Sequence, residues 1–235
     1  MSKKITKEEA TKIINSIKSR YPELRQASKS ITFSANYFGT YRTFMENSGI
    51  PEKEAKQIEA NFHKLYAATD NWNNAMLDKA GSCGYVDLAF GGRLRTPILA
   101  QTIANTRSTP YEATAERRSA GNALIQSYGL LTNRAAIEFQ ERALASKYAL
   151  DIKIVALIHD AIYLVIKDDV HVVKWVNDNL ISCMEWDDLP ELKHPTVKLG
   201  ASLELFYPHW GHSIEIPNNA SIQEIKQHCH QGEDP

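Results

Sequence analysis

Two runs of β-branched and other apolar residues constrain the fold of this chain most. They cover residues 152–158 and 162–166, and only His159, Asp160 and Ala161 separate them. Runs of this composition favour β-strands, and a short polar connection between two of them is typical of a hairpin. The sequence therefore predicts an antiparallel hairpin with a polar tip.

Most of the remaining chain has helical periodicity. Thr6 is placed to cap a first helix, and Pro51 is placed in the first turn of a long one. Gly91 and Gly92 allow a second, small hairpin between residues 84–90 and 93–95. The sequence predicts helices over residues 6–19, 23–37, 52–79, 113–148 and 170–186. It also predicts a polar connection of about twenty residues after Arg95, which contains Pro97 and Pro110, a last strand over 197–205, and a loosely held polar tail after Trp210.

Composition excludes several classes of protein. The 235 residues are enough for one large domain or two small ones, and they contain no apolar run of membrane-spanning length. The net charge of −1 excludes a uniformly basic nucleic-acid binder, although residues 1–50 hold nine cations against four acids. The three cysteines are widely spaced, which favours reduced thiols over a disulfide frame or a zinc site. We expect a soluble, cytoplasmic protein without a membrane partner.

Four residues at strict four-residue spacing form the first candidate site. Arg25, Lys29, Phe33 and Tyr37 fall along one face of a predicted helix. Cations can neutralise a polyphosphate, and aromatic rings beyond them offer a flat surface to a sugar or base. Spacing alone leaves open the alternative that Phe33 and Tyr37 belong to the core while the two cations are solvated.

A second row of polar side chains recurs every four residues on another predicted helix. Arg118, Asn122 and Gln126 could donate to the acceptors in a nucleic-acid minor groove, where little sequence is read. The opposite side of this helix is apolar, so an ordinary solvent-exposed face is the alternative.

The polar tip of the large hairpin is the third candidate. An ionised carboxylate beside apolar strands is costly unless a cation or donor compensates it, which makes Asp160 a candidate metal ligand. A simple turn aspartate is the alternative. The His-Asp pair of metal phosphohydrolases needs a helical context, whereas strands flank His159 and Asp160 here.

Taken in order, these segments resemble the C-terminal part of the family A DNA polymerases, the class of bacterial polymerase I and several phage replicases. Residues 25–37 resemble the RxxxKxxxFxxxY motif of the fingers helix, and residues 118–126 resemble the RxxxNxxxQ helix of the palm. Residues 157–161 resemble the VHDE motif. Further similarity lies in Gly84-Tyr85-Val86 with Gly91-Gly92-Arg93 and Arg95, which match a GYV…GRRR element, and in the closing segment Trp210-Gly211-His212. The similarity covers most of residues 20–212.

The resemblance implies a role for each matching residue. Lys29 and Arg25 would hold the triphosphate of an incoming deoxynucleotide, and Phe33 would pack on its sugar, where the family associates Phe with rejection of dideoxynucleotides. Tyr37 would stack near the templating base, and Asp160 would bind a pair of catalytic Mg²⁺ ions; Asp160 and Lys29 are thus the implied catalytic residues. DNA contacts would come from Asn122 and Gln126 in the minor groove, Arg118 on the backbone and His159 at the primer end.

The resemblance also implies an α+β fold with the domain order of a right-hand polymerase. Residues 1–82 would form fingers helices, with the nucleotide-binding helix at about 23–38, and residues 83–118 a small hairpin and connection. Residues 119–212 would form the C-terminal part of the palm, with its antiparallel sheet, and residues 213–235 a polar tail. In the family, the thumb and the first palm strands come before these segments, and none of the segments described above corresponds to them.

A two-metal site needs a second carboxylate, which the family carries in a DYSxxEL segment, and no such segment occurs in this sequence. We therefore expect half of a split polymerase, of phage origin and working in the cytoplasm of a bacterial host. A separate N-terminal polypeptide would supply that carboxylate and the thumb; whether it also carries an exonuclease is left open. A recombinant fragment or a truncated gene would have the same sequence.

Two residues depart from the family pattern. Phe38 stands where the family has glycine, which predicts a different bend at the end of the fingers helix. Ala161 replaces the glutamate of the VHDE motif, which predicts weaker metal binding rather than loss of activity. Both departures leave room for an alternative function, that of a catalytically inactive, polymerase-like subunit that binds DNA or supports processivity.

Overall fold

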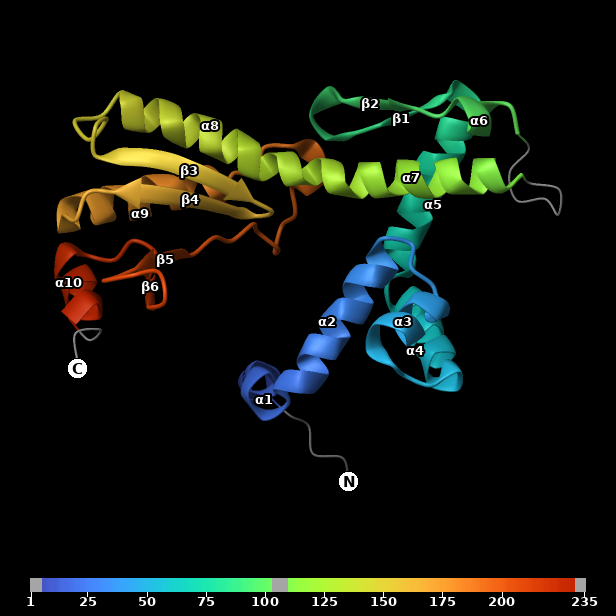
Figure 1. Ribbon diagram of the computed structural model, residues 1–235, viewed down its shortest axis with the longest axis horizontal. Coiled ribbons are helices and arrows are strands. Elements are labelled where there is room, and N and C mark those ends of the chain that lie inside the picture. Colours follow the sequence, from blue (N-terminus) through green and yellow to red (C-terminus); the bar gives the residue numbers. More distant parts are fainter. Residues whose placement is uncertain (1–5, 103–109, 231–235) are drawn as a thin grey trace. The chain divides into compact units, whose positions relative to one another are not determined.

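The computed structural model describes residues 6–102 and 110–230, which form two compact units divided between Tyr128 and Gly129 (Figure 1). Helices and three two-stranded antiparallel sheets make up the fold, which confirms the predicted α+β class. Lys3 and Lys4 of the basic end, and most of the polar connection before Pro110, lie outside the described residues. No helix within the described part is both long and apolar enough to span a membrane.

The first unit begins with the predicted capped helix. In α1 (Lys7–Arg20), the Thr6 hydroxyl accepts a hydrogen bond from the backbone N–H of Glu9, and the Glu9 carboxylate accepts one from the Thr6 N–H. This reciprocal pair is a capping box, which satisfies two N–H groups that a helix end leaves free. Pro22 then occupies the first turn of α2 (Pro22–Asn36).

A small core joins α2 to α3 (Tyr41–Ser48) and α4 (Glu52–Leu65). It is built from Ile31, Ala35, Phe44 and Ala55, all of which are buried. A second core lies between α5 (Ala67–Cys83), β1 (Tyr85–Asp87) and α7 (Tyr111–Gln126). Its buried members are Leu77, Ala80, Val86, Ala120 and Leu124.

The single helix predicted over residues 52–79 is wrong, because it is divided at Tyr66 between α4 and α5. The two halves serve different cores: Ala55 of α4 is buried in the first, and Leu77 of α5 in the second. Leu65, the last residue of α4, is 74% exposed. A straight helix presents one apolar stripe in one direction, so a change of direction allows both halves to be buried.

The small hairpin is shorter than predicted. β1 pairs with β2 (Arg93–Arg95), so that Asp87 lies opposite Arg93, and a 3₁₀ turn over Ala89–Gly91 closes the end. After β2 the chain enters the short helix α6 (Pro97–Ala100).

The helix predicted over residues 113–148 is also divided. α7 ends at Gln126, a 3₁₀ turn follows over Ser127–Gly129, and the next helix begins at Leu130. The buried Ser127 hydroxyl accepts the backbone N–H of Ala89 and donates to the carbonyl of Leu124. A hydroxyl bonded to the backbone in this way stabilises a local turn in competition with helix continuation.

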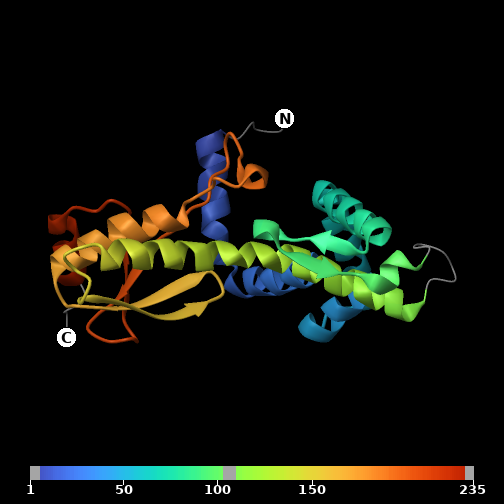
Figure 2. The same ribbon diagram turned by 90° about the horizontal axis from the view of Figure 1, so that it is seen from above.

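The second unit contains the large hairpin. β3 (Ile152–Ile158) pairs with β4 (Ala161–Ile166), as predicted, with an irregular register between Ile154 and Ala156. α8 (Leu130–Leu144) and α9 (Val170–Met184) cover one face of this hairpin (Figure 2). The core between them contains Ala135, Phe139, Ala143, Ile152, Val172, Val176, Leu180 and Cys183.

Residues 213–230 are folded, so the expectation of a loosely held tail is wrong for them. β6 (Ser213–Ile216) pairs with β5 (Leu203–Phe206), and α10 (Ile222–His230) follows. Ile216, Ala220 and Ile225 are at most 2% exposed and pack with Val173. Three apolar residues dispersed among polar ones were enough to anchor this segment, because the core they enter is formed by other parts of the chain.

A buried amide also ties this segment to α9. The side chain of Asn177 donates to the carbonyl of Pro217, at 3.0 Å, and accepts the backbone N–H of Asn219, at 3.1 Å. The last predicted strand, over 197–205, is reduced to the four residues of β5, preceded by a 3₁₀ turn over Pro190–Leu192 and irregular backbone.

Candidate functional site

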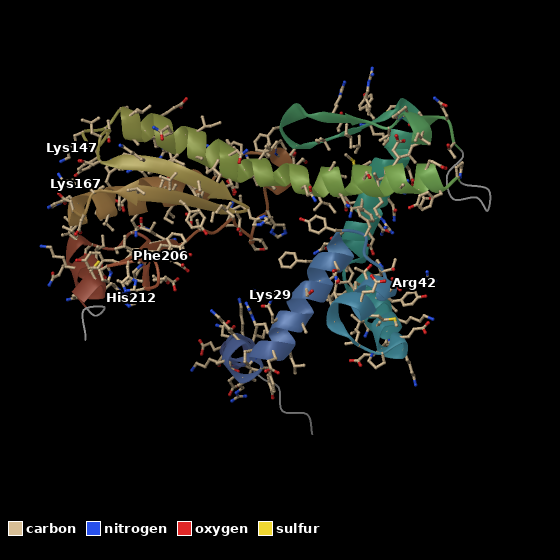
Figure 3. All side chains as sticks on the ribbon, in the orientation of Figure 1. Lys29, Arg42, Lys147, Lys167, Phe206 and His212 are labelled. Carbon is tan, nitrogen blue, oxygen red and sulfur yellow. The ribbon has the colours of Figure 1, made fainter. Side chains whose placement is uncertain are left out.

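The face of α2 that carries the first candidate residues is turned to solvent. Phe33 is 59% exposed and Tyr37 39% exposed, whereas the core contacts of the helix come from Ile31 and Ala35. The alternative in which Phe33 and Tyr37 belong to the core is therefore wrong. Lys29 lies on the same helix and is exposed (Figure 3).

A hollow of about 690 Å³ lies beside this face of α2. It combines two cations, Lys29 and Arg118, with two aromatic side chains that the motif predicted, and no carboxylate lines it. Neither cation has an ion pair with any residue of the described ranges. Its lining consists of Gln26, Lys29, Ser30, Phe33, Ser34, Tyr37, Phe38, Gly39, Thr43 and Arg118.

This arrangement can bind an anion with a flat group attached to it. Lysine and arginine form strong charge-assisted hydrogen bonds to phosphate, and exposed aromatic rings stack on bases or sugars. Hydroxyl groups of Ser30, Ser34 and Thr43 add further donors. Arg25, the remaining member of the predicted stripe, is partly buried and does not line the hollow.

The sequence contained a signal for some of the lining residues that the stripe omitted. Gln26, Ser30, Ser34 and Phe38 form a second row at four-residue spacing, one position after the first. All four line the hollow: the helical members lie three residues before members of the first row, which makes them neighbours on the helix surface, and Phe38 belongs to the turn that follows α2. Thr43 comes from α3, and nothing in its local sequence marks it.

The turn after α2 is a Schellman motif with phenylalanine in the position that usually holds glycine. The N–H of Phe38 donates to the carbonyl of Ala35, at 3.1 Å, and that of Gly39 to the carbonyl of Ser34, at 2.7 Å. Phe38 has a φ of 62°, in the left-handed region that glycine adopts most readily. At the position where the family has glycine, Phe38 therefore adopts the backbone conformation that suits glycine.

The three polar residues of α7 differ in their surroundings. Arg118 and Gln126 are exposed, and Arg118 reaches the hollow. Asn122 is partly buried, and its side-chain oxygen has no hydrogen-bond partner within the described part of the chain. An ordinary solvent face therefore does not describe the whole row. Asn122 and Gln126 do not line the hollow.

The tip of the large hairpin is exposed, so the apolar strands beside Asp160 do not remove its carboxylate from water. Leu157 is 43% and Ile158 50% exposed, and His159, at a φ of 55°, and Asp160 form the turn. The core beneath α8 and α9 includes Ile152 and packs against residues as near the tip as Ile162, but it includes none of residues 157–160. Burial thus gives no argument for a metal at Asp160.

Asp160 is still chemically suited to supply one carboxylate ligand of a magnesium site. Its carboxylate is exposed and has no ion pair or hydrogen bond to another described residue. Magnesium is usually held by one or two carboxylates together with substrate phosphates and water. Within residues 6–102 and 110–230, no group of three or more His, Cys, Asp and Glu side chains could hold a metal. Ala161, the second departure, begins β4 opposite Ile158.

The closing segment, residues 210–212, contacts the large hairpin within the second unit. Trp210 stacks on Phe206 with ring centroids 4.4 Å apart, and its ring lies 5.6 Å from that of Tyr163 on β4. The ring of His212 bonds to the carbonyl of Tyr207, at 2.6 Å. Phe206 and His212 are both labelled in Figure 3. The contact of Trp210 with Tyr163 connects the β5–β6 loop to β4.

Comparison with known proteins identifies the family. The model of the family described as DNA polymerase family A matches residues 2–209. A curated relative, the thermostable DNA polymerase I of Thermus filiformis, is 27% identical over 86 residues, which are 37% of this chain and 10% of the relative.

A solved structure has a similar fold. The POL domain of Pol1 from M. smegmatis, in complex with DNA primer-template and dNTP, has a TM-score of 0.60 and 19% sequence identity to this chain. The match covers 76% of this chain and 29% of that one. This chain spans about a tenth of the length of the curated relative and under a third of the solved one. The chain belongs to DNA polymerase family A.

Proposed function

We propose that this chain supplies the nucleotide-binding helix and one metal-binding carboxylate of a DNA-directed DNA polymerase. The observation that supports it best is the hollow beside α2, in a member of DNA polymerase family A: it brings together exposed aromatic rings and two cations that have no ion pair among the described residues. Its substrates would be deoxynucleoside triphosphates and a primer-template.

Different residues around the hollow would bind different parts of the nucleotide and of the DNA. Lys29, with Arg25 beside it on α2, neutralises the triphosphate, and Phe33 provides an apolar surface for the deoxyribose. Tyr37 stacks near the templating base at the C-terminal end of the helix. Arg118 contacts the DNA backbone. Lys29 also counts as a catalytic group, since it would stabilise the negative charge that develops on the triphosphate.

The chemistry is in-line transfer of a nucleotide to the 3′-oxygen of the primer. Asp160 would hold a pair of Mg²⁺ ions, which supply Lewis-acid stabilisation of the attacking and leaving oxygens when bound. His159 would contact the primer end, and Asn122 and Gln126 would contact the minor groove of the new base pair. The absence of the glutamate at Ala161 would weaken metal binding.

The second metal-binding carboxylate is proposed to come from a separate N-terminal polypeptide. Its DYSxxEL segment has no counterpart in the 235 residues, and Asp160 alone would leave a two-metal site without its second carboxylate. This proposal predicts that the chain alone does not extend a primer and that addition of the partner restores Mg²⁺-dependent extension.

Nucleotide binding by this chain tests the proposal directly. A fluorescent dATP analogue should bind, and Lys29→Ala should weaken binding about 10- to 100-fold, because one charge-assisted hydrogen bond is worth roughly 1.5–3 kcal/mol. Lys12→Ala removes an exposed lysine of α1 and serves as the matched control, with unchanged affinity expected. No binding by the parent chain, or equal effects of the two substitutions, would contradict the proposal.

Primer extension distinguishes catalysis from simple DNA binding. With the partner present, Asp160→Ala should abolish extension and leave primer-template binding largely intact. Ala161 favours the rival function, an inactive polymerase-like DNA-binding subunit, because it removes an acid beside Asp160. Binding of primer-template without any template-directed incorporation, in the presence of the partner, would favour the rival.

A further inference from the structure

We propose that Phe38 is a positioning residue, whose ring fits against Gly121 and sets the geometry of the hollow. The inference rests on the proposed function, because it concerns the same nucleotide site. Phe38 follows directly after Tyr37 and lines the hollow itself. Its role would be to join the end of α2 to α7 rather than to react with the substrate.

The backbone at Phe38 is held in an unfavourable conformation by its surroundings. A φ of 62° brings the Cβ of any residue but glycine close to its own backbone, so a bulky side chain is rarely found there. Hydrogen bonds from Phe38 to Ala35 and from Gly39 to Ser34 keep the turn closed on both sides. A phenylalanine at this position needs a compensating contact, and such strain is often concentrated at functional sites.

Phe38 makes this compensating contact with the second core of the first unit. The Phe38 ring packs with Leu77 and its neighbours, and it occupies the space above the backbone of Gly121 on α7. A Cβ on Gly121 would lie 2.5 Å from two carbon atoms of the ring, and 3.4 Å from Leu77. Phe38 can therefore keep this position only while residue 121 has no side chain.

The contact joins the two walls of the hollow. Lys29 and Tyr37 lie on the α2 side, and Arg118 lies on α7, three residues before Gly121. If the ring is displaced from Gly121, α2 and α7 lose the contact that sets their separation, and the cations that face a bound triphosphate move apart. Loss of a single charge-assisted hydrogen bond to the triphosphate is enough to weaken binding about tenfold.

The pair also explains how the family departure at Phe38 is tolerated. The aromatic ring and the missing side chain at Gly121 are complementary, so the two residues should depend on each other. Asn122, whose side-chain oxygen is buried without a partner in the described ranges, is the next residue on α7. A shift of α7 at Gly121 would therefore also move this amide.

A double-mutant cycle tests the inference, with binding of a fluorescent dATP analogue to the full chain as the readout. Gly121→Ala and Phe38→Gly should each weaken binding by about tenfold or more, since separating the walls of the hollow removes at least one charge-assisted hydrogen bond to the triphosphate. The double variant should bind no more weakly than Phe38→Gly alone, because a methyl group at residue 121 clashes only when the ring is present. Gly81→Ala, where the nearest atom is 3.9 Å from the added Cβ, is the matched control and should bind like the parent.

Circular dichroism on the same samples separates positioning from loss of fold. Affinity is measured where each variant is folded, so a purely structural role would change thermal stability and leave affinity unchanged. Gly121→Ala and Phe38→Gly within twofold of a nucleotide-binding parent would overturn the inference and spare the proposed function. A parent chain that binds no nucleotide would overturn both. If Gly121→Ala alone fails to fold, the double variant decides, because it must regain the fold and bind like Phe38→Gly; a double variant that stays unfolded would overturn the inference.

Discussion

Replacement of Gly39 by alanine should destabilise the first unit more than any other glycine-to-alanine change outside Gly121. An added Cβ would lie 2.6 Å from the carbonyl oxygen of Ser34 and 3.0 Å from its carbonyl carbon. Both are backbone atoms, so no side-chain rotation can relieve the overlap. The oxygen also accepts the 2.7 Å hydrogen bond from the Gly39 N–H that closes the turn.

The structure gives the approximate size of the effect. Opening the turn would break one backbone hydrogen bond, at a net cost of about 1 kcal/mol. Strain from the inserted methyl group adds about 1–3 kcal/mol, as in other overpacked sites. We therefore expect Gly39→Ala to lower the free energy of unfolding by about 2–4 kcal/mol, a large share of the roughly 5–15 kcal/mol of a typical domain.

Urea unfolding followed by circular dichroism measures this, with Gly81→Ala as the control. Gly81 lies within α5, and the nearest atom to an added Cβ is 3.9 Å away. The same substitution there should raise the free energy of unfolding by about 0.5–1 kcal/mol, because alanine is the better helix former. Equal effects at the two positions, or a change below about 0.5 kcal/mol for Gly39→Ala, would refute the steric argument.

Three further predictions concern the rest of the fold. Ile225→Ala should lower the free energy of unfolding by about 2–5 kcal/mol, because Ile225 is 1% exposed in the core that it forms with Val173 and Ile216. In the same urea experiment, alanine at the exposed Gln227 is the neutral control, and equal stability of the two variants would contradict a packed C-terminal helix. Thr6→Ala should cost about 1 kcal/mol of helix stability through loss of the capping box, seen as faster amide exchange in the first turn of α1; unchanged exchange would be evidence against the cap. Burial raises the pKa of the Cys183 thiol, so the stability that the neutral thiol contributes should be complete below the ordinary thiol pKa and should be lost as pH rises through the pKa of the folded state. The free energy of unfolding should therefore fall more steeply at alkaline pH in the parent than in Cys183→Ala, and parallel pH profiles of the two proteins would contradict this prediction.

Local sequence signals predicted much of the secondary structure. Thr6 and Glu9 determine the start of α1 through side chains three residues apart, and the two β-branched runs determine the large hairpin through their composition and short connection. Such features depend on neighbours within one or two turns, so they can be recognised without knowing the rest of the fold.

The motif spacing also predicted much of the candidate site, while the tertiary fold decided which residues share it. Four-residue spacing placed Lys29, Phe33 and Tyr37 on one face of a helix, but a helix with apolar residues on two faces does not show which face is buried. Ile31 and Ala35 took the core side because Phe44 and Ala55 pack there. The exposed face that remains is the one that carries the cations and aromatic rings.

The sequence by itself determined the elements with a strong local code: the capped first helix, the polar-tipped hairpin and the row of cations and aromatic rings on α2. Only the tertiary structure decided where Tyr66 divides a helix, that Ile216 and Ile225 anchor the C-terminal segment, and that Phe38 meets Gly121. Each of these depends on atoms that are distant in sequence, and packing in a core has no fixed spacing along the chain by which it could be recognised.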